Sequence, residues 1–164
     1  MILYLVRHGI AVDPTDPKSP PEAERPLTAS GVQKTRSAAL GLRAMGAKPD
    51  VLISSPYVRA AQTAEIFAEA LGFAPEKIRV SEALKPAGNP AEILKEISHL
   101  KAKEVACFGH APNLDLIISH LAGARGPFTE LKKAGVACFE QSNAHGHWQM
   151  RWILTPKVLR QLGE

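Results

Sequence analysis

Two arginines and two histidines stand at the ends of three short apolar runs of the sequence. Arg7 and His8 follow the first run directly. Arg59 comes shortly after the second run, and His110 follows another. An arginine guanidinium can bind two phosphate oxygens at once, and histidine can act as a nucleophile toward phosphorus. If the fold brings these four side chains together, they predict a site for phosphoryl chemistry.

Backbone groups beside these side chains favour the same anion. Gly9 follows His8 and relieves crowding where the chain passes it. Helices expected to begin near Ser55 and Ala111 would aim N–H groups at an anion, so we count Ala111 among the phosphate-binding residues. The sequence has no glycine-rich phosphate loop and no Asp/Glu cluster for magnesium. We therefore expect no metal and no cofactor, with arginines stabilising the charge instead.

None of these residues is informative alone. A single histidine after a strand is usually structural, and a single helical arginine is usually a solvated charge. The tripeptide Arg-His-Gly occurs by chance in many proteins. The joint placement of Arg7, His8, Arg59 and His110 at three strand ends is what favours a site.

The elements that must position these residues alternate along the chain. Short apolar runs bounded by glycine or proline predict strands, and runs with helical spacing and capping residues predict helices. Strands are predicted over 2–6, 50–55, 77–84, 104–110, 134–141 and 147–154, and helices over 28–46, 57–72, 90–100, 111–123 and 155–164. The proline-rich segment 13–26 predicts an exposed loop.

This alternation predicts a three-layer α/β sandwich, with helices on both faces of a mostly parallel central sheet. The last two strands are expected to be joined by a turn at 143–146. The length of 164 residues suits a single domain over 1–164. Ligands bind at the carboxyl ends of the strands in such sheets, and the four polar residues follow strands there.

Composition excludes several functional classes. The net charge of +4 is mild and unclustered, and aromatic residues make up only 5% of the chain, so we expect no nucleic-acid partner. No segment has transmembrane length, and the first apolar run is too short for a signal peptide. Cys107 and Cys138 lie in strand-like runs and are expected to be buried thiols. A cytoplasmic protein without a membrane partner is the expectation.

Four motifs together resemble the histidine phosphatase (phosphoglycerate mutase-like) superfamily. They read LVRHG, RPLTASGVQKT, SSPYVRAAQTA and FGHAPNLDLI, in that family's order and spacing. The resemblance implies a phosphoglycerate mutase-like fold and a phosphorylated nucleophile, His8. It also implies that Arg7, Arg59 and His110 complete the phosphate pocket. Ile10 departs from the pattern, because many relatives have an acidic or amide side chain there.

Within the superfamily the chain is most similar to the SixA-type phosphohistidine phosphatases. Like them it is short and lacks the insertions that wall the active site of larger relatives. An open pocket suits phosphohistidine on a signalling protein as the partner. A small phosphorylated metabolite, such as a sugar phosphate or nucleotide precursor, is the alternative substrate. A phospho-binding module without turnover is a further alternative, which the retained His8 disfavours.

The resemblance also implies an acid near residue 82 that protonates the leaving group. Glu82 is the candidate, and an exposed surface glutamate is the competing interpretation of the same residue. A protonated imidazole leaving group needs less help from an acid than an alkoxide does. A weak acid at this position would therefore favour phosphohistidine over phosphoserine.

Overall fold

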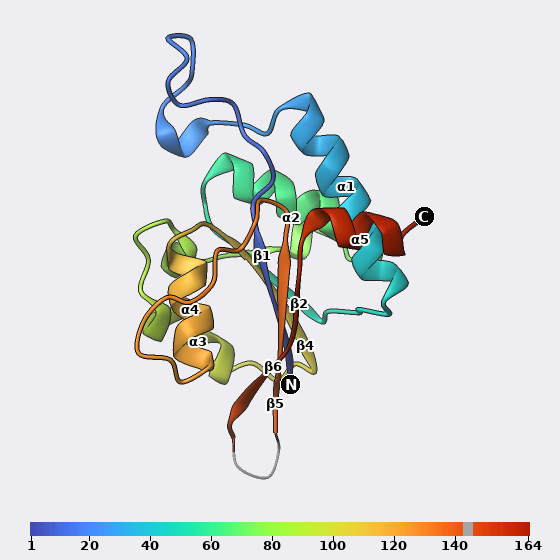
Figure 1. The fold of residues 1–164 in the computed structure, drawn as a ribbon, viewed down its shortest axis with the longest axis vertical. Helices are drawn as coiled ribbons and strands as arrows, with labels where there is room; N and C mark the ends of the chain where they lie inside the picture. The colour runs from blue at the N-terminus through green and yellow to red at the C-terminus, as the bar shows by residue number, and fades with distance from the viewer. Residues whose placement is uncertain (143–145) are drawn as a thin grey trace.

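The first strand, β1 (Ile2–Arg7), lies inside the central sheet of the computed structural model (Figure 1). The structure describes residues 1–142 and 146–164, and six strands among them form one sheet in the order β3-β2-β4-β1-β5-β6. β4 (Glu104–Gly109) pairs with β1 in parallel, and β5 (Val136–Gln141) pairs with its other edge in antiparallel fashion.

The outer strands complete the sheet. β2 (Val51–Ser54) pairs in parallel with β4 and with β3 (Arg79–Val80). β6 (Trp148–Leu154) is antiparallel to β5, so it runs in the same direction as β1. The predicted mostly parallel sheet is confirmed, with β5 as the one reversed strand among those described. Residues 143–145 of the predicted final turn lie outside the described residues.

The third strand is shorter than predicted. It ends at Val80 rather than at Leu84, because the Ser81 hydroxyl accepts a hydrogen bond from the Ala83 amide at 3.2 Å and starts a turn. Residues Glu82–Leu84 then form a 3₁₀ helix instead of continuing the strand. Glu82 therefore begins a helical turn at the end of an edge strand.

The helices form where capping residues predict them. The described residues contain the α-helices α1 (Ala29–Ala44), α2 (Val58–Leu71), α3 (Pro90–Ser98), α4 (Asn113–Leu121) and α5 (Pro156–Leu162). The Thr28 hydroxyl caps α1 by accepting from the Gly31 amide at 2.9 Å, and Gly72 ends α2 with a φ of 73°. None of the described helices is long and apolar enough to cross a membrane.

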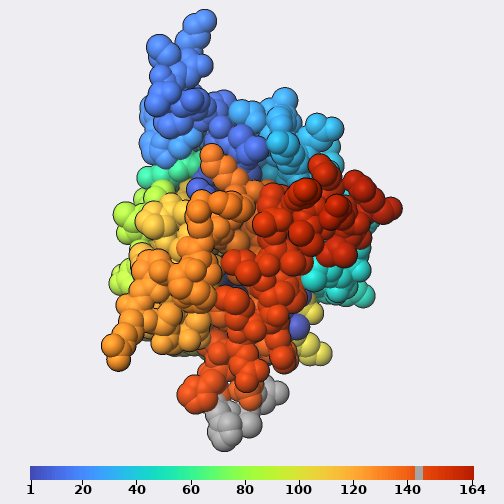
Figure 2. Space-filling view, in the orientation of Figure 1, coloured from blue at the N-terminus to red at the C-terminus, as the bar shows by residue number. Residues whose placement is uncertain are grey.

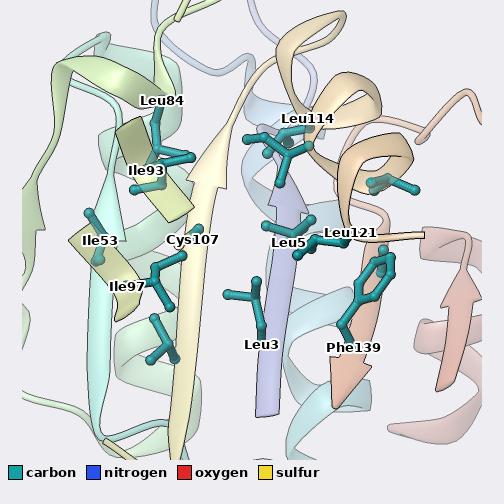
Figure 3. Close-up of a cluster of buried hydrophobic side chains, with 14 of the residues drawn as sticks. Leu3, Leu5, Ile53, Leu84, Ile93, Ile97, Cys107, Leu114, Leu121 and Phe139 are labelled. Carbon is teal, nitrogen blue, oxygen red and sulfur yellow. The ribbon is translucent and has the colours of Figure 1, made fainter. Parts of the chain in front are cut away.

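Two apolar layers hold the helices on the sheet. α3 and α4 cover one face and α1, α2 and α5 the other, and Figure 1 shows α3 and α4 to one side of the sheet and α1 and α5 to the opposite side. Alternate side chains of β1 enter both layers, Leu5 the first and Tyr4 the second. In Figure 3, Leu5 lies among Cys107, Leu121 and other buried side chains. β1 is thus buried on both faces, as its uninterrupted apolar run predicts.

Both cysteines are free buried thiols, as predicted. Cys107 belongs to the layer under α3 and α4, whereas Cys138 belongs to the layer on the opposite face of the sheet. Burial raises the pKa of both thiols, so neither is a reactive thiolate at neutral pH.

The segment after β1 packs directly on α1 because glycines stand at the contact. A Cβ atom on Gly9 would lie well inside van der Waals contact with the Thr35 hydroxyl oxygen. A Cβ atom on Gly31 would overlap the Ile10 carbonyl oxygen in the same way. The loop that carries His8 is therefore held against a helix with no room for a methyl group between them.

We predict that Gly31→Ala lowers the free energy of unfolding by about 1–3 kcal/mol, because the backbone at Ile10 must move. Gly126→Ala is the matched control: no atom lies within 4 Å of an added Cβ there, so a change within about 0.5 kcal/mol is expected. Urea denaturation measures both. Equal midpoints for the two variants would contradict the close contact.

Candidate active site

The pairing of β1 with β4 brings the two histidines together. Arg7 and Gly109 are partners in the parallel register, and the His8 amide donates to the Gly109 carbonyl at 3.0 Å. His8 and His110 therefore leave the sheet side by side, with ring centroids 5.0 Å apart. β2 lies on the other side of β4 and delivers Ser55 to the same edge. β2, β4 and β1 are therefore neighbours in the sheet, which is the condition for the predicted site residues to converge.

The hydrogen bonds of His8 determine its tautomer. Its Nδ1 lies 2.7 Å from the Gly9 carbonyl oxygen, which can only accept, so Nδ1 carries the proton. Its Nε2 lies 3.3 Å from Nε of Arg59, which can only donate. Nε2 therefore holds the lone pair and faces the guanidinium of Arg59.

Burial keeps both imidazoles neutral. Burial lowers the pKa of His8 to about 3, and the positive charges of Arg59, Arg7 and Lys133 act in the same direction. Burial also lowers the pKa of His110, and the neighbouring His8 and the arginines lower it further. Both side chains are uncharged at neutral pH, and the His8 lone pair is available as a nucleophile.

Glu22 binds Arg59, which the sequence did not predict. The two terminal nitrogens of the buried Arg59 donate to the Glu22 carbonyl and to Glu22 Oε1, each at 2.7 Å. Arg25 donates two hydrogen bonds to the same carboxylate, from Nε at 2.7 Å and from a terminal nitrogen at 2.8 Å. These bonds, those from Arg25 first, hold the pKa of Glu22 below its usual range. A phosphoryl oxygen would compete with Glu22 for the terminal nitrogens of Arg59.

Two further polar atoms of the site are buried without a partner among the described residues. They are Nε of Arg7 and Nδ1 of His110. Arg7 is anchored by a 2.7 Å hydrogen bond to the Leu131 carbonyl, and His110 Nε2 lies 2.9 Å from the Ser55 hydroxyl. A buried polar atom without a partner is costly, and an oxyanion offers what both atoms lack. The pattern fits an anion-binding site.

Three side chains for which the sequence predicted no role support the site. The Thr63 hydroxyl accepts from the Gly9 amide at 3.0 Å and donates to the Arg59 carbonyl at 2.7 Å, so it joins α2 to the loop after β1. The Tyr57 ring lies 5.2 Å from the His110 ring and 5.2 Å from the Arg59 guanidinium carbon. Ser55 orients His110. All three residues lie in the motif SSPYVRAAQTA, which is the sequence signal that could have drawn attention to them.

The roles of the other two predicted residues, Ala111 and Glu82, rest on the sequence analysis alone. Ala111 lies two residues before α4, and its role in phosphate binding stays a prediction. Glu82 is mostly exposed and forms an ion pair with Lys85. Among the described residues, no hydrogen bond or ion pair joins Glu82 to His8, Arg7, Arg59 or His110. Its role as an acid also stays a prediction.

The donor set suits an oxyanion rather than a metal. Two guanidinium groups and two imidazoles meet here, and no group of three or more His, Cys, Asp or Glu side chains that could hold a metal ion occurs in residues 1–142 and 146–164.

The model of the histidine phosphatase superfamily (branch 1) matches residues 3–87, which is more than half of the chain. The chain belongs to this superfamily. Membership supports phosphatase activity.

Two relatives resemble the chain over nearly its whole length. An uncharacterized protein of Picosynechococcus sp. is 36% identical, over 97% of this chain and 99% of its own. Phosphohistidine phosphatase SixA of Escherichia coli is 28% identical, over 92% of this chain and 93% of its own.

A solved structure also resembles the chain over nearly its whole length. The protein histidine phosphatase SixA complexed with tungstate has a TM-score of 0.84 and 24% identity, covering 97% of this chain and 99% of that one. The predicted resemblance to the SixA-type histidine phosphatases is confirmed, as is the phosphoglycerate mutase-like fold.

We predict that Glu22→Gln tightens the binding of inorganic phosphate by about threefold to tenfold, because it removes a carboxylate that competes for Arg59. Glu24→Gln, at an exposed position in the same short helix, is the matched control and should change the affinity less than about twofold. Isothermal titration calorimetry measures both. Weaker binding by Glu22→Gln would show instead that Glu22 is needed to hold Arg59 in place.

Proposed function

We propose that the chain is a metal-independent phosphatase that hydrolyses phosphohistidine on a signalling protein, acting as a single cytoplasmic domain through a phosphorylated His8. The observation that carries the proposal is the tautomer of His8. Its Nδ1 proton is held by the Gly9 carbonyl, which leaves Nε2 with its lone pair beside Arg59. A binding module without turnover would not need a buried, neutral imidazole at this place.

The proposed reaction has two displacements. Nε2 of His8 attacks phosphorus in line, and the bond from phosphorus to the substrate nitrogen breaks as that nitrogen takes a proton. Water then attacks the phosphorus of phosphorylated His8. The bond to Nε2 breaks, inorganic phosphate leaves and the lone pair of Nε2 is restored.

The side chains around His8 support both displacements by stabilising charge. In a loose transition state negative charge spreads over the three equatorial oxygens of the phosphoryl group. Arg59 would bind these oxygens in place of the Glu22 carboxylate. The unpartnered Arg7 Nε and His110 Nδ1 offer further contacts. The side chains of His8, Arg59 and His110 are buried, which strengthens their interactions.

Among the described residues, the two acids closest to a role here, Glu82 and Glu22, are both engaged in ion pairs, which favours phosphohistidine over a phosphate ester. Glu82 would have to break its ion pair with Lys85 before it could protonate a leaving group. Glu22 has a lowered pKa and stays ionised at neutral pH. An imidazole leaves as a weakly basic group, whereas an alkoxide needs a proton donor. The substrate class of the proposal rests on this difference.

A substrate panel tests the proposal. Phosphohistidine peptide, p-nitrophenyl phosphate and several sugar phosphates are assayed for phosphate release, with and without a chelator. We expect the highest kcat/KM for the phosphohistidine peptide and no effect of the chelator. Faster release from a sugar phosphate would favour a small-molecule phosphatase, and chelator-sensitive release would contradict the metal-free mechanism. No release from any substrate would favour a binding module.

Substitution of the nucleophile sharpens this test. His8→Ala should lower kcat/KM for the phosphohistidine peptide by at least about 10³-fold, because the covalent route is lost. His99→Ala, at the end of α3, is the matched control and should leave the rate unchanged. A His8→Ala protein with full activity would overturn the assignment.

A further inference from the structure

Two adjoining hollows lie beside the phosphoryl site. Their lining residues come from α1, α5 and the segment before β5, which are coloured light blue, red and orange in Figure 2. The first, of about 500 Å³, is lined by Arg7 and by Lys34, Lys132 and Lys133. The second, of about 260 Å³, is lined by Lys34, Lys157 and Arg160. The two hollows share Lys34 and Pro156 and therefore adjoin, and we call them together the basic groove.

The basic groove carries a strong excess of positive charge. Glu130 is the one acidic residue among the described residues that line it, and it is paired with Lys132 at 2.8 Å. The remaining lining cations come from four separate segments, so the positive charge is not the solvated face of a single helix. Cations gathered in a concave surface raise the local concentration of anionic partners and speed their association.

The basic groove is continuous with the phosphoryl site. Arg7 belongs to both, and Ile10, two residues after His8, lines the groove. The charge of Lys133 also reaches His8, since it is among the causes that lower the pKa of that imidazole. A segment of substrate that follows the groove would therefore place its next residues beside the nucleophile.

We propose that the basic groove docks an acidic segment of the protein that presents the phosphohistidine. This inference rests on the function proposed above and adds how the substrate is recognised. Ile10, Ala134 and Pro156 also line the groove, and this mixture of apolar and cationic residues suits a peptide with both acidic and apolar side chains. No aromatic residue is among the described residues that line the groove, so it lacks the stacking surfaces of a single-stranded nucleic-acid site.

The test compares two phosphohistidine peptides of equal length, one flanked by aspartates and one by lysines. At low ionic strength we expect a kcat/KM about tenfold higher for the aspartate peptide, and a much smaller difference at high ionic strength. Lys34→Glu/Lys157→Glu should remove or reverse the preference. Lys101→Glu/Lys103→Glu introduces the same number of glutamates just before β4, at the opposite end of the parallel strands, and should keep the preference. All three proteins should hydrolyse p-nitrophenyl phosphate at the same rate.

The possible results separate the docking surface from the proposed function. Equal rates on both peptides, with p-nitrophenyl phosphate still hydrolysed, would overturn the docking surface alone. A loss of p-nitrophenyl phosphate hydrolysis in Lys34→Glu/Lys157→Glu would also overturn it, because the change would then lie in the phosphoryl site. A DNA oligonucleotide that competes as well as an unphosphorylated aspartate peptide would show general attraction of polyanions and overturn the acidic-protein assignment. No hydrolysis of any substrate would reject the proposed function itself.

Discussion

The hydrogen bond from His8 Nδ1 to the Gly9 carbonyl is the interaction on which the chemistry of this site depends. It decides which imidazole nitrogen is free. The Gly9 carbonyl is held in turn by the bond from the Gly9 amide to Thr63 and by the direct packing of Gly9 on α1. Contacts from β1, α1 and α2 therefore together set the tautomer of His8. Small residues at their contacts are required because a side chain at position 9 would move that carbonyl.

Much of the fold was predictable because its signals are local. The apolar run of β1, the cap at Thr28 and the glycine after α2 each define an element from a few neighbouring residues. The end of β3 was not predicted correctly, because the Ser81 side chain starts a turn inside the predicted strand. An edge strand with two exposed residues has little burial to extend it further.

The candidate site was predictable only in part. The rule that ligands bind at the carboxyl ends of parallel strands placed His8 and His110 together, and their 5.0 Å separation agrees with it. The contact between Glu22 and Arg59 could not be predicted, because it depends on how the proline-rich segment folds back over α2. No periodicity or capping signal marks a residue in such a segment. The basic groove also required the structure, since its lysines and arginines come from four segments.

The most direct test of the account is to identify the nitrogen of His8 that carries phosphate. Protein labelled with ¹⁵N is mixed with phosphohistidine substrate, the phosphorylated form is trapped by rapid quenching at alkaline pH, and the linkage is read by ³¹P and ¹⁵N NMR. Phosphate on Nε2 is the result that the Gly9 and Arg59 hydrogen bonds predict. Phosphate on Nδ1, or on another residue, would contradict the central claim.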